Sequence, residues 1–237
     1  MGRSKKRLGR LDDGLRCKQQ ALARDPRSPG VLVQIAISYW HQRKYDDTLV
    51  WAQRALDVDP KHVLACQFIN KVYLKIGDIN RFGAWTVSQT IAWGFPEARV
   101  AVLKQVTAEM QQVYATAGLS GVRRFLVDQI TNPQLDFDPL LKMAFFRAIL
   151  YGGAGRLDEA FDCLDQAIAD RDPALVHLAV APDWDSLRGD PRFAERLRSM
   201  ALPSIAHDNI APKTVAEVAG GGVLPHPPLS SISDARR

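Results

Sequence analysis

Residues 9–26 read GRLDDGLRCKQQALARDP, and residues 43–60 read RKYDDTLVWAQRALDVDP. The two stretches share an Asp-Asp pair, an Ala-Leu pair and an Asp-Pro pair at a spacing of 34 positions (43 − 9). A second shift by the same period places Tyr73 on Tyr39 and puts Gly77-Asp78 at the turn where the previous unit has Arg43-Lys44. A repeat of this length is typical of helical solenoids, in which each unit is one supersecondary element.

Each unit predicts two amphipathic helices that cannot bury their apolar faces alone and must therefore stack. We expect helices over residues 31–42 and 46–57, then over residues 63–76 and 79–91, because apolar residues recur there at helical spacing. Asp59-Pro60 should end the first pair, since proline cannot continue the hydrogen-bond ladder. The predicted fold is all-α, a right-handed superhelical solenoid of antiparallel helix pairs.

The register loosens after Pro96. A long helix over residues 99–117, a turn over 118–121 and a second helix over 122–130 make at best a degenerate unit. The repeat pattern then returns from Ala148 to Ala167 and is closed by Asp172-Pro173.

The period and the order of small, aromatic and proline positions resemble the tetratricopeptide repeat (TPR) family. A second resemblance lies in Arg171-Asp172-Pro173, residues 182–188 and residues 190–193, which look like the C-terminal end of TPR regions attached to bacterial winged-helix transcription regulators and adenylate cyclases. Asp190 is a predicted N-cap before Pro191, so residues 191–200 should form a capping helix, with Trp184 pinning it to the last repeat.

These patterns divide the chain into seven predicted segments. They are a basic N-terminal arm (1–8), a partial unit with a second helix only (9–28), two TPR units (29–96), a degenerate helical pair (97–140), a TPR unit (141–173), a C-terminal cap (174–201) and a disordered tail (202–237).

The expected binding surface is the concave face, which the first helix of each pair lines. A mixture of amide, imidazole, ammonium and apolar side chains there can hold a peptide or a helix. The candidate partner-binding residues are Gln34, Ile37, His41, Gln67, Phe68, Lys71 and Lys75. Lys71 and Lys75 favour an acidic ligand.

Catalysis is not expected. The acidic pairs Asp12-Asp13, Asp46-Asp47 and Asp158-Glu159 share one repeat position, where they should cap the second helix. The five histidines lack metal-ligand spacing and no phosphate-binding loop is present, so we expect no metal and no cofactor. A hydrolase or transferase site at Arg123-Arg124 and Asp128 is a further alternative, because the repeat pattern does not explain these residues.

The resulting hypothesis is a non-catalytic protein-protein interaction module. The alternative is a detached regulatory or sensory arm of a bacterial signalling protein of the transcription-regulator or adenylate-cyclase type. An open N-terminal half-repeat would also allow self-association through Leu15 and Leu22.

Composition and charge argue against several other classes of protein. The formal charge of +5 is accounted for by five basic residues that precede any acid, so nucleic acid is not the expected partner. Three distant cysteines, Cys17, Cys66 and Cys163, predict neither a disulfide framework nor a zinc site. No apolar stretch of spanning length and no secretory signal is visible, so the expected location is the cytoplasm.

Overall fold

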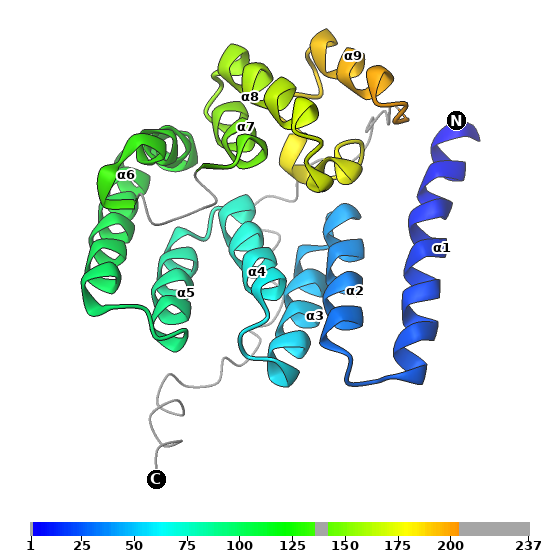
Figure 1. The fold of residues 1–237 in the computed structure, drawn as a ribbon, viewed down its shortest axis with the longest axis horizontal. Coiled ribbons are helices and arrows are strands. Elements are labelled where there is room, and N and C mark those ends of the chain that lie inside the picture. Colours follow the sequence, from blue (N-terminus) through cyan, green and yellow to red (C-terminus); the bar gives the residue numbers. More distant parts are fainter. Residues whose placement is uncertain (1, 136–141, 204–237) are drawn as a thin grey trace.

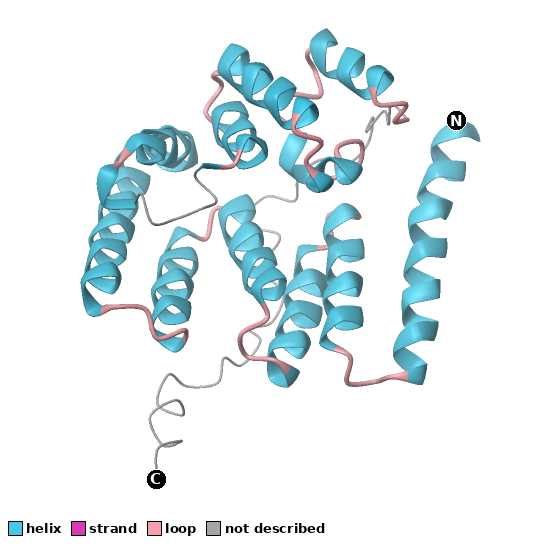
Figure 2. Ribbon diagram, viewed as in Figure 1, coloured by secondary structure: helices cyan, strands magenta, loops and turns pink. Residues whose placement is uncertain are grey.

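Nine α-helices follow one another along the described part of the chain, and each packs on its neighbours in sequence (Figure 1). The computed structural model describes residues 2–135 and 142–203, with the backbone alone for residues 2–10. The helices are α1 (Gly2–Arg24), α2 (Pro29–His41), α3 (Tyr45–Val58), α4 (Val63–Ile76), α5 (Ile79–Ala92), α6 (Glu97–Asp128), α7 (Ala144–Gly153), α8 (Leu157–Ala169) and α9 (Pro191–Ser199). No strand occurs among these residues (Figure 2), which confirms the all-α prediction.

The two central pairs, α2 with α3 and α4 with α5, lie where the 34-residue period predicts them, within two residues at each end. Ala36 and Ala55 are fully buried, and such small side chains let helix backbones approach closely. The pair α4–α5 is joined by Gly77 in the left-handed conformation and by Asp78, whose carboxylate accepts from the Arg81 amide at the start of α5. Local sequence signals therefore account for this part of the fold.

The N-terminal helix differs from the prediction. A basic arm over residues 1–8 and a separate helix capped by Asp12-Asp13 were expected, but α1 runs without a break from Gly2 to Arg24. Lysine and arginine are good helix formers, and a single glycine costs a helix only about 1 kcal/mol, so nothing local forces a turn at Gly9. Asp12-Asp13 consequently lies inside a helix rather than at its start.

The acidic pairs of the later units lie in the first turn of their helices, as expected, but they do not cap them. The N-cap residues of α3 and α8 are Lys44 and Arg156, and neither side chain makes a capping hydrogen bond. Asp46-Asp47 and Asp158-Glu159 thus act through the helix dipole.

Of the turn predicted over residues 118–121, only Gly118 departs from helical geometry. Its φ of 59° and ψ of −162° interrupt α6 between two helical parts. Residues 136–141, the end of that predicted segment, lie outside the described residues, as do residues 204–237 of the predicted disordered tail.

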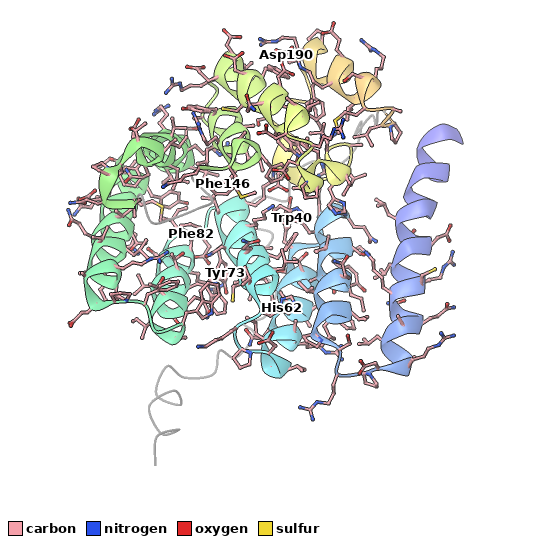
Figure 3. All side chains as sticks on the ribbon, in the orientation of Figure 1. Trp40, His62, Tyr73, Phe82, Phe146 and Asp190 are labelled. Carbon is pink, nitrogen blue, oxygen red and sulfur yellow. The ribbon has the colours of Figure 1, made fainter. Side chains whose placement is uncertain are left out.

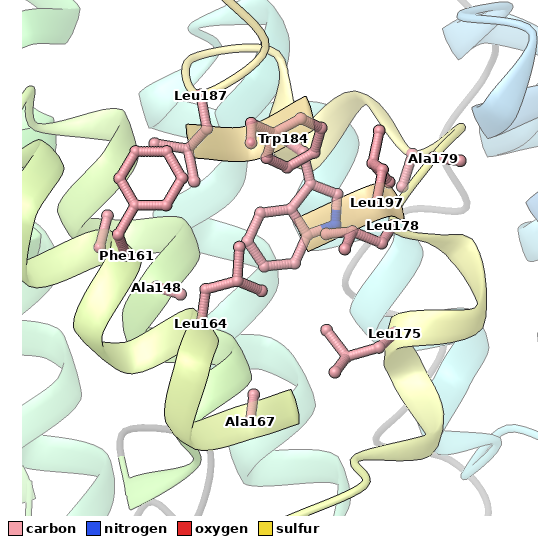
Figure 4. Packing of buried hydrophobic residues seen from close by; sticks show 13 residues of the cluster. Ala148, Phe161, Leu164, Ala167, Leu175, Leu178, Ala179, Trp184, Leu187 and Leu197 are labelled. Atoms are coloured by element: carbon pink, nitrogen blue, oxygen red, sulfur yellow. The ribbon is translucent and has the colours of Figure 1, made fainter. Parts of the chain in front are cut away.

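The C-terminal helices α7, α8 and α9 share one core with the short 3-10 helices η4 (Pro173–His177) and η5 (Pro182–Trp184) (Figure 4). Trp184 is buried there, and its ring centroid lies 5.3 Å from that of Phe145 and 6.4 Å from that of Phe193. Asp190 accepts a hydrogen bond from the Arg192 amide and caps α9. The predicted N-cap at Asp190 is therefore confirmed, and Trp184 packs against Phe193 of α9 as expected.

Even α1 and α6, the longest described helices, are too polar to qualify as bilayer spans, and the shorter ones do not qualify either.

Candidate functional site

The C-terminal ends of α2 and α4 contact a segment that lies more than 100 residues later in the chain. Trp40 of α2 and Arg43 just after it, with Lys71 and Lys75 of α4, face the η5 segment, which carries Asp183 and Asp185. Figure 3 labels Trp40 at this place, below the η5 segment. We call this set of six residues the polar junction.

Asp183 is the buried centre of the junction, with its side chain 7% exposed. Its carboxylate accepts a hydrogen bond from Trp40 Nε1 at 3.1 Å and pairs with Lys71 Nζ at 3.0 Å. Burial raises the pKa of Asp183, but the Lys71 ammonium and these hydrogen bonds outweigh burial and hold the pKa below its usual range. The carboxylate is therefore ionised at neutral pH.

Asp185 lies at the more open side of the junction and gathers three cations. Arg43 Nη2 donates to its carboxylate at 2.5 Å, Lys75 Nζ lies at 3.2 Å and Arg188 Nε at 3.1 Å. Burial raises the pKa of Asp185, while Lys75 and Arg43 lower it further than burial raises it. Lys75 also donates to the Pro182 carbonyl at 2.8 Å, so the backbone of the segment is held as well.

Arg188 stabilises the backbone conformation of the η5 segment. Its guanidinium donates to the carbonyls of Ala179 and Ala181 at 3.0 and 2.9 Å, in addition to Asp185. These bonds fix the turn that presents both carboxylates to α2 and α4.

The apolar side chains of the same segment pack elsewhere. Leu178, Trp184 and Leu187 are buried in the core with α7, α8 and α9 (Figure 4). Across the junction the segment therefore meets α2 and α4 with polar side chains, while its apolar side chains belong to the C-terminal core.

An apolar cluster supports the cationic side of the junction from below. Trp40 packs with Phe68 at 6.0 Å and with Tyr45 at 5.4 Å between ring centroids, and Ile37 completes the contact. The Lys71 ammonium lies 5.2 Å from the centroid of Phe68, within range of a cation–π contact. Burial raises the pKa of Tyr45 to about 12, so its hydroxyl stays protonated.

A pair of histidines lies beside the junction. The rings of His41 and His177 are 4.7 Å apart between centroids. Burial first, and then His177, lower the pKa of His41 to about 3, so His41 is neutral. On the same face of α2, Lys18 of α1 donates to Ser38 Oγ at 2.7 Å and to the Gln34 carbonyl at 3.1 Å, and this ties α1 to α2.

The seven predicted partner-binding residues fall into three groups. Ile37 and Phe68 are core residues, and His41 is covered by His177. Lys71 and Lys75 hold acids, as their charge suggests, but these acids belong to the same chain.

Gln34, which is exposed, and Gln67, which is half-buried, form the third group. Leu64, one turn before Gln67 on α4, is also exposed, at 41%, and was not among the predicted residues. These three residues form an accessible part of the surface of α2 and α4.

Sequence reasoning missed the two aspartates. Their only signal is the order Pro182-Asp183-Trp184-Asp185, in which acids at alternate positions flank a tryptophan. It also left Arg43 out, because Arg43 stands at the turn position of the repeat; there its φ is 59° and its side chain is 7% exposed.

Other groups that could carry chemistry are dispersed. Within the described ranges, His, Cys, Asp and Glu side chains do not gather in threes that could hold a metal ion. Arg124 and Asp128 are exposed, and Arg123 packs against Gly153. Burial raises the pKa of the Cys66 thiol to about 11, which makes it unreactive at neutral pH.

Comparison with known proteins found no match to a family model, to a curated protein or to a solved structure.

Proposed function

We propose that this chain is a non-catalytic helical-repeat module of the TPR kind that binds a segment of another protein across α2 and α4. The neighbour-to-neighbour helix packing and the 34-residue repeat support a solenoid in which these two helices line the same face. The observation that carries the proposal is that this face already holds two carboxylates of a peptide segment, through Lys71 and Lys75. Its chemistry is that of a site for acidic peptides.

Beside the two lysines, this face offers three further accessible residues, Gln34, Leu64 and Gln67. Amide side chains hydrogen-bond a peptide backbone, and an exposed leucine supplies apolar contact area. A partner segment laid across α2 and α4 would meet these residues next to the polar junction.

The test compares three baits in the native lysate by quantitative capture: the wild type, Leu64→Glu and a matched control, Val50→Glu. Val50 lies on α3, outside the face, with an exposed fraction of 38% against 41% for Leu64. We expect a partner that the wild type and Val50→Glu retain at equal amounts and that Leu64→Glu loses. Equal capture by all three folded baits would contradict the proposal.

The identity of that partner also decides the alternative function. The resemblance of residues 171–193 to the TPR ends of signalling proteins motivates a regulatory arm acting on a separate effector. Retention of a nucleotide cyclase or a DNA-binding protein would favour that reading.

A further inference from the structure

We propose that residues 182–185 act as an internal ligand, which occupies a binding site for another protein on α2 and α4. When the polar junction opens, an acidic segment of that protein takes their place. Like Asp183 and Asp185, its two carboxylates are two residues apart. This inference rests on the proposed function and names the chemistry of the partner.

Charge complementarity identifies the occupant. When the η5 segment leaves, Arg188 leaves with it, and Arg43, Lys71 and Lys75 remain as three cations on α2 and α4. The Trp40 N–H also loses its acceptor, Asp183. A ligand that restores all four contacts needs two carboxylates at the spacing that Asp183 and Asp185 provide, whereas a neutral or basic segment would leave the cations uncompensated.

The arrangement of apolar side chains allows the junction to open. Trp184 and Leu187 are buried in the core with α7, α8 and α9, and Trp40 remains packed on Phe68 and Tyr45. Separation at the junction therefore exposes the ionic side chains and uncovers His41, which His177 covers, but leaves the apolar cores on both sides in place. Polar contacts of this kind between parts of one chain resemble transient protein–protein interfaces.

The two lysines are also reachable from solvent. The side chains of Lys71 and Lys75 are 26% and 23% exposed, so an acidic ligand can approach them before the internal segment has left completely. The competition is unequal, because an intramolecular occupant acts at a high effective concentration.

A labelled peptide with the sequence of residues 180–189, VAPDWDSLRG, is the probe, and fluorescence anisotropy reports its binding. The proteins are the wild type, Asp183→Asn/Asp185→Asn, and the latter with Lys71→Glu/Lys75→Glu added. Weakening the internal occupant should raise the fraction of open face, so the Asn variant should bind the peptide about tenfold more tightly than the wild type. The added Glu substitutions should abolish binding, and raising salt from about 50 mM to about 300 mM should weaken it.

A peptide with Asn at both acidic positions is the matched probe and should not bind. Binding of the acidic peptide that is equal in the wild type and the Asn variant, or unchanged by the Glu substitutions, would overturn the inference. If the double Asn variant fails to fold, Asp185→Asn alone replaces it, because Asp185 is the more exposed acid at 33%.

These outcomes are separable from the test of the proposed function. Peptide competition depends on the junction cations, whereas capture of the native partner is probed at Leu64, which makes no junction contact. If the peptide does not bind but capture of the partner still depends on Leu64, the proposed function stands and the inference about residues 182–185 is wrong.

Discussion

The indole nitrogen of Trp40 lies 3.1 Å from a carboxylate oxygen of Asp183, which is 143 residues further along the chain. A stack of repeats needs contacts only between neighbours, and this contact joins a helix near the start of the described chain to the segment between its last helices. Lys71 and Arg43 add ion pairs at the same place. The C-terminal core is therefore held against α2 and α4 by side chains that the repeat pattern does not require.

Asp183→Asn should destabilise the chain by about 2 kcal/mol, since hydrogen bonds to charged groups contribute about 1.5 to 3 kcal/mol each. The amide keeps the shape of the carboxylate but leaves Lys71 without its counter-charge in a largely buried position. Chemical denaturation at neutral pH measures the loss.

Asp158→Asn is the matched control, because Asp158 also pairs with an arginine, Arg192, but its side chain is 86% exposed. Exposed pairs contribute little, so we expect a loss well below that of Asp183→Asn, limited to the weak interaction of Asp158 with the dipole of α8. Equal losses in the two variants would mean that the junction is no more than a surface contact.

Much of the helix pattern could be predicted because it depends on residues close in sequence. Residues 63–76 were predicted to be helical, and α4 has those bounds. The Gly118 break and the Asp190 cap also follow from local conformational preferences. The error at the N-terminus arose because a helix start was inferred from the position of Asp12-Asp13 in the repeat, whereas residues 2–24 form one helix.

Only the basic side of the polar junction could be predicted from the sequence. Lys71 and Lys75 were selected because helical spacing places them together, and helical spacing is a local property. Their contact with Asp183 and Asp185 depends on how α5 to α8 turn the chain, which periodicity within a helix does not encode. A preference for acids was therefore predictable, but the origin of those acids in the same chain was not.

Arg171→Gly should stabilise the chain by about 0.5 to 1 kcal/mol. Arg171 follows α8 with a φ of 53°, a conformation that costs residues with a Cβ about 1 kcal/mol and costs glycine almost nothing. Its amide donates to the Ile168 carbonyl, and the Asp172 amide donates to Ala167, so the helix end itself favours glycine. Thermal or chemical unfolding would show the gain.

Arg43→Gly makes the comparison informative, because Arg43 has a similar φ of 59° but its guanidinium binds Asp185. We expect the relief of strain to be cancelled or exceeded by the lost ion pair. A gain at position 43 as large as that at position 171 would argue against any contribution from the Arg43–Asp185 contact.

Gly14→Ala should stabilise α1 by about 0.5 to 1 kcal/mol, since glycine inside a helix costs that much relative to alanine. A Cβ at Gly14 would meet nothing within 4 Å.

At Gly152 of α7 the same change to alanine should destabilise the chain, because its Cβ would lie 3.0 Å from Leu187 Cδ2 and 3.1 Å from Ser186 Oγ. In unfolding experiments the change in the free energy of unfolding should therefore have opposite signs for Gly14→Ala and Gly152→Ala. A gain in stability for Gly152→Ala would show that the contact between α7 and the Leu187 segment is loose.

The buried histidine should make stability fall on mild acidification. The pKa of His41 is about 3 in the folded chain against 6.5 as its ordinary value, so below about pH 6.5 the unfolded state takes up a proton that the folded state does not. Stability is full above that pH and is lost as pH falls toward 3. Between about pH 7.5 and about pH 5 the loss should be about 2 kcal/mol.

The charges that face His41 support this sign. Lys18 from α1, Lys71 from α4 and His177 from η4 lower its pKa, and Asp183 alone among the named groups raises it. The pKa of His177 is lowered as well, so its contribution has the same direction. Asp183 and Asp185 have pKa values below their usual range and stay ionised at pH 5, so they do not confuse the measurement in this window.

His41→Gln removes the titrating group while it keeps a polar side chain at the same position. Urea titrations at several pH values should give a clearly flatter dependence for this variant than for the wild type, with the remaining slope belonging to His177. If the two curves fell in parallel from neutral pH to pH 5, the loss would have to come from other groups, and the contact of His41 with His177 beside the polar junction would carry no proton linkage.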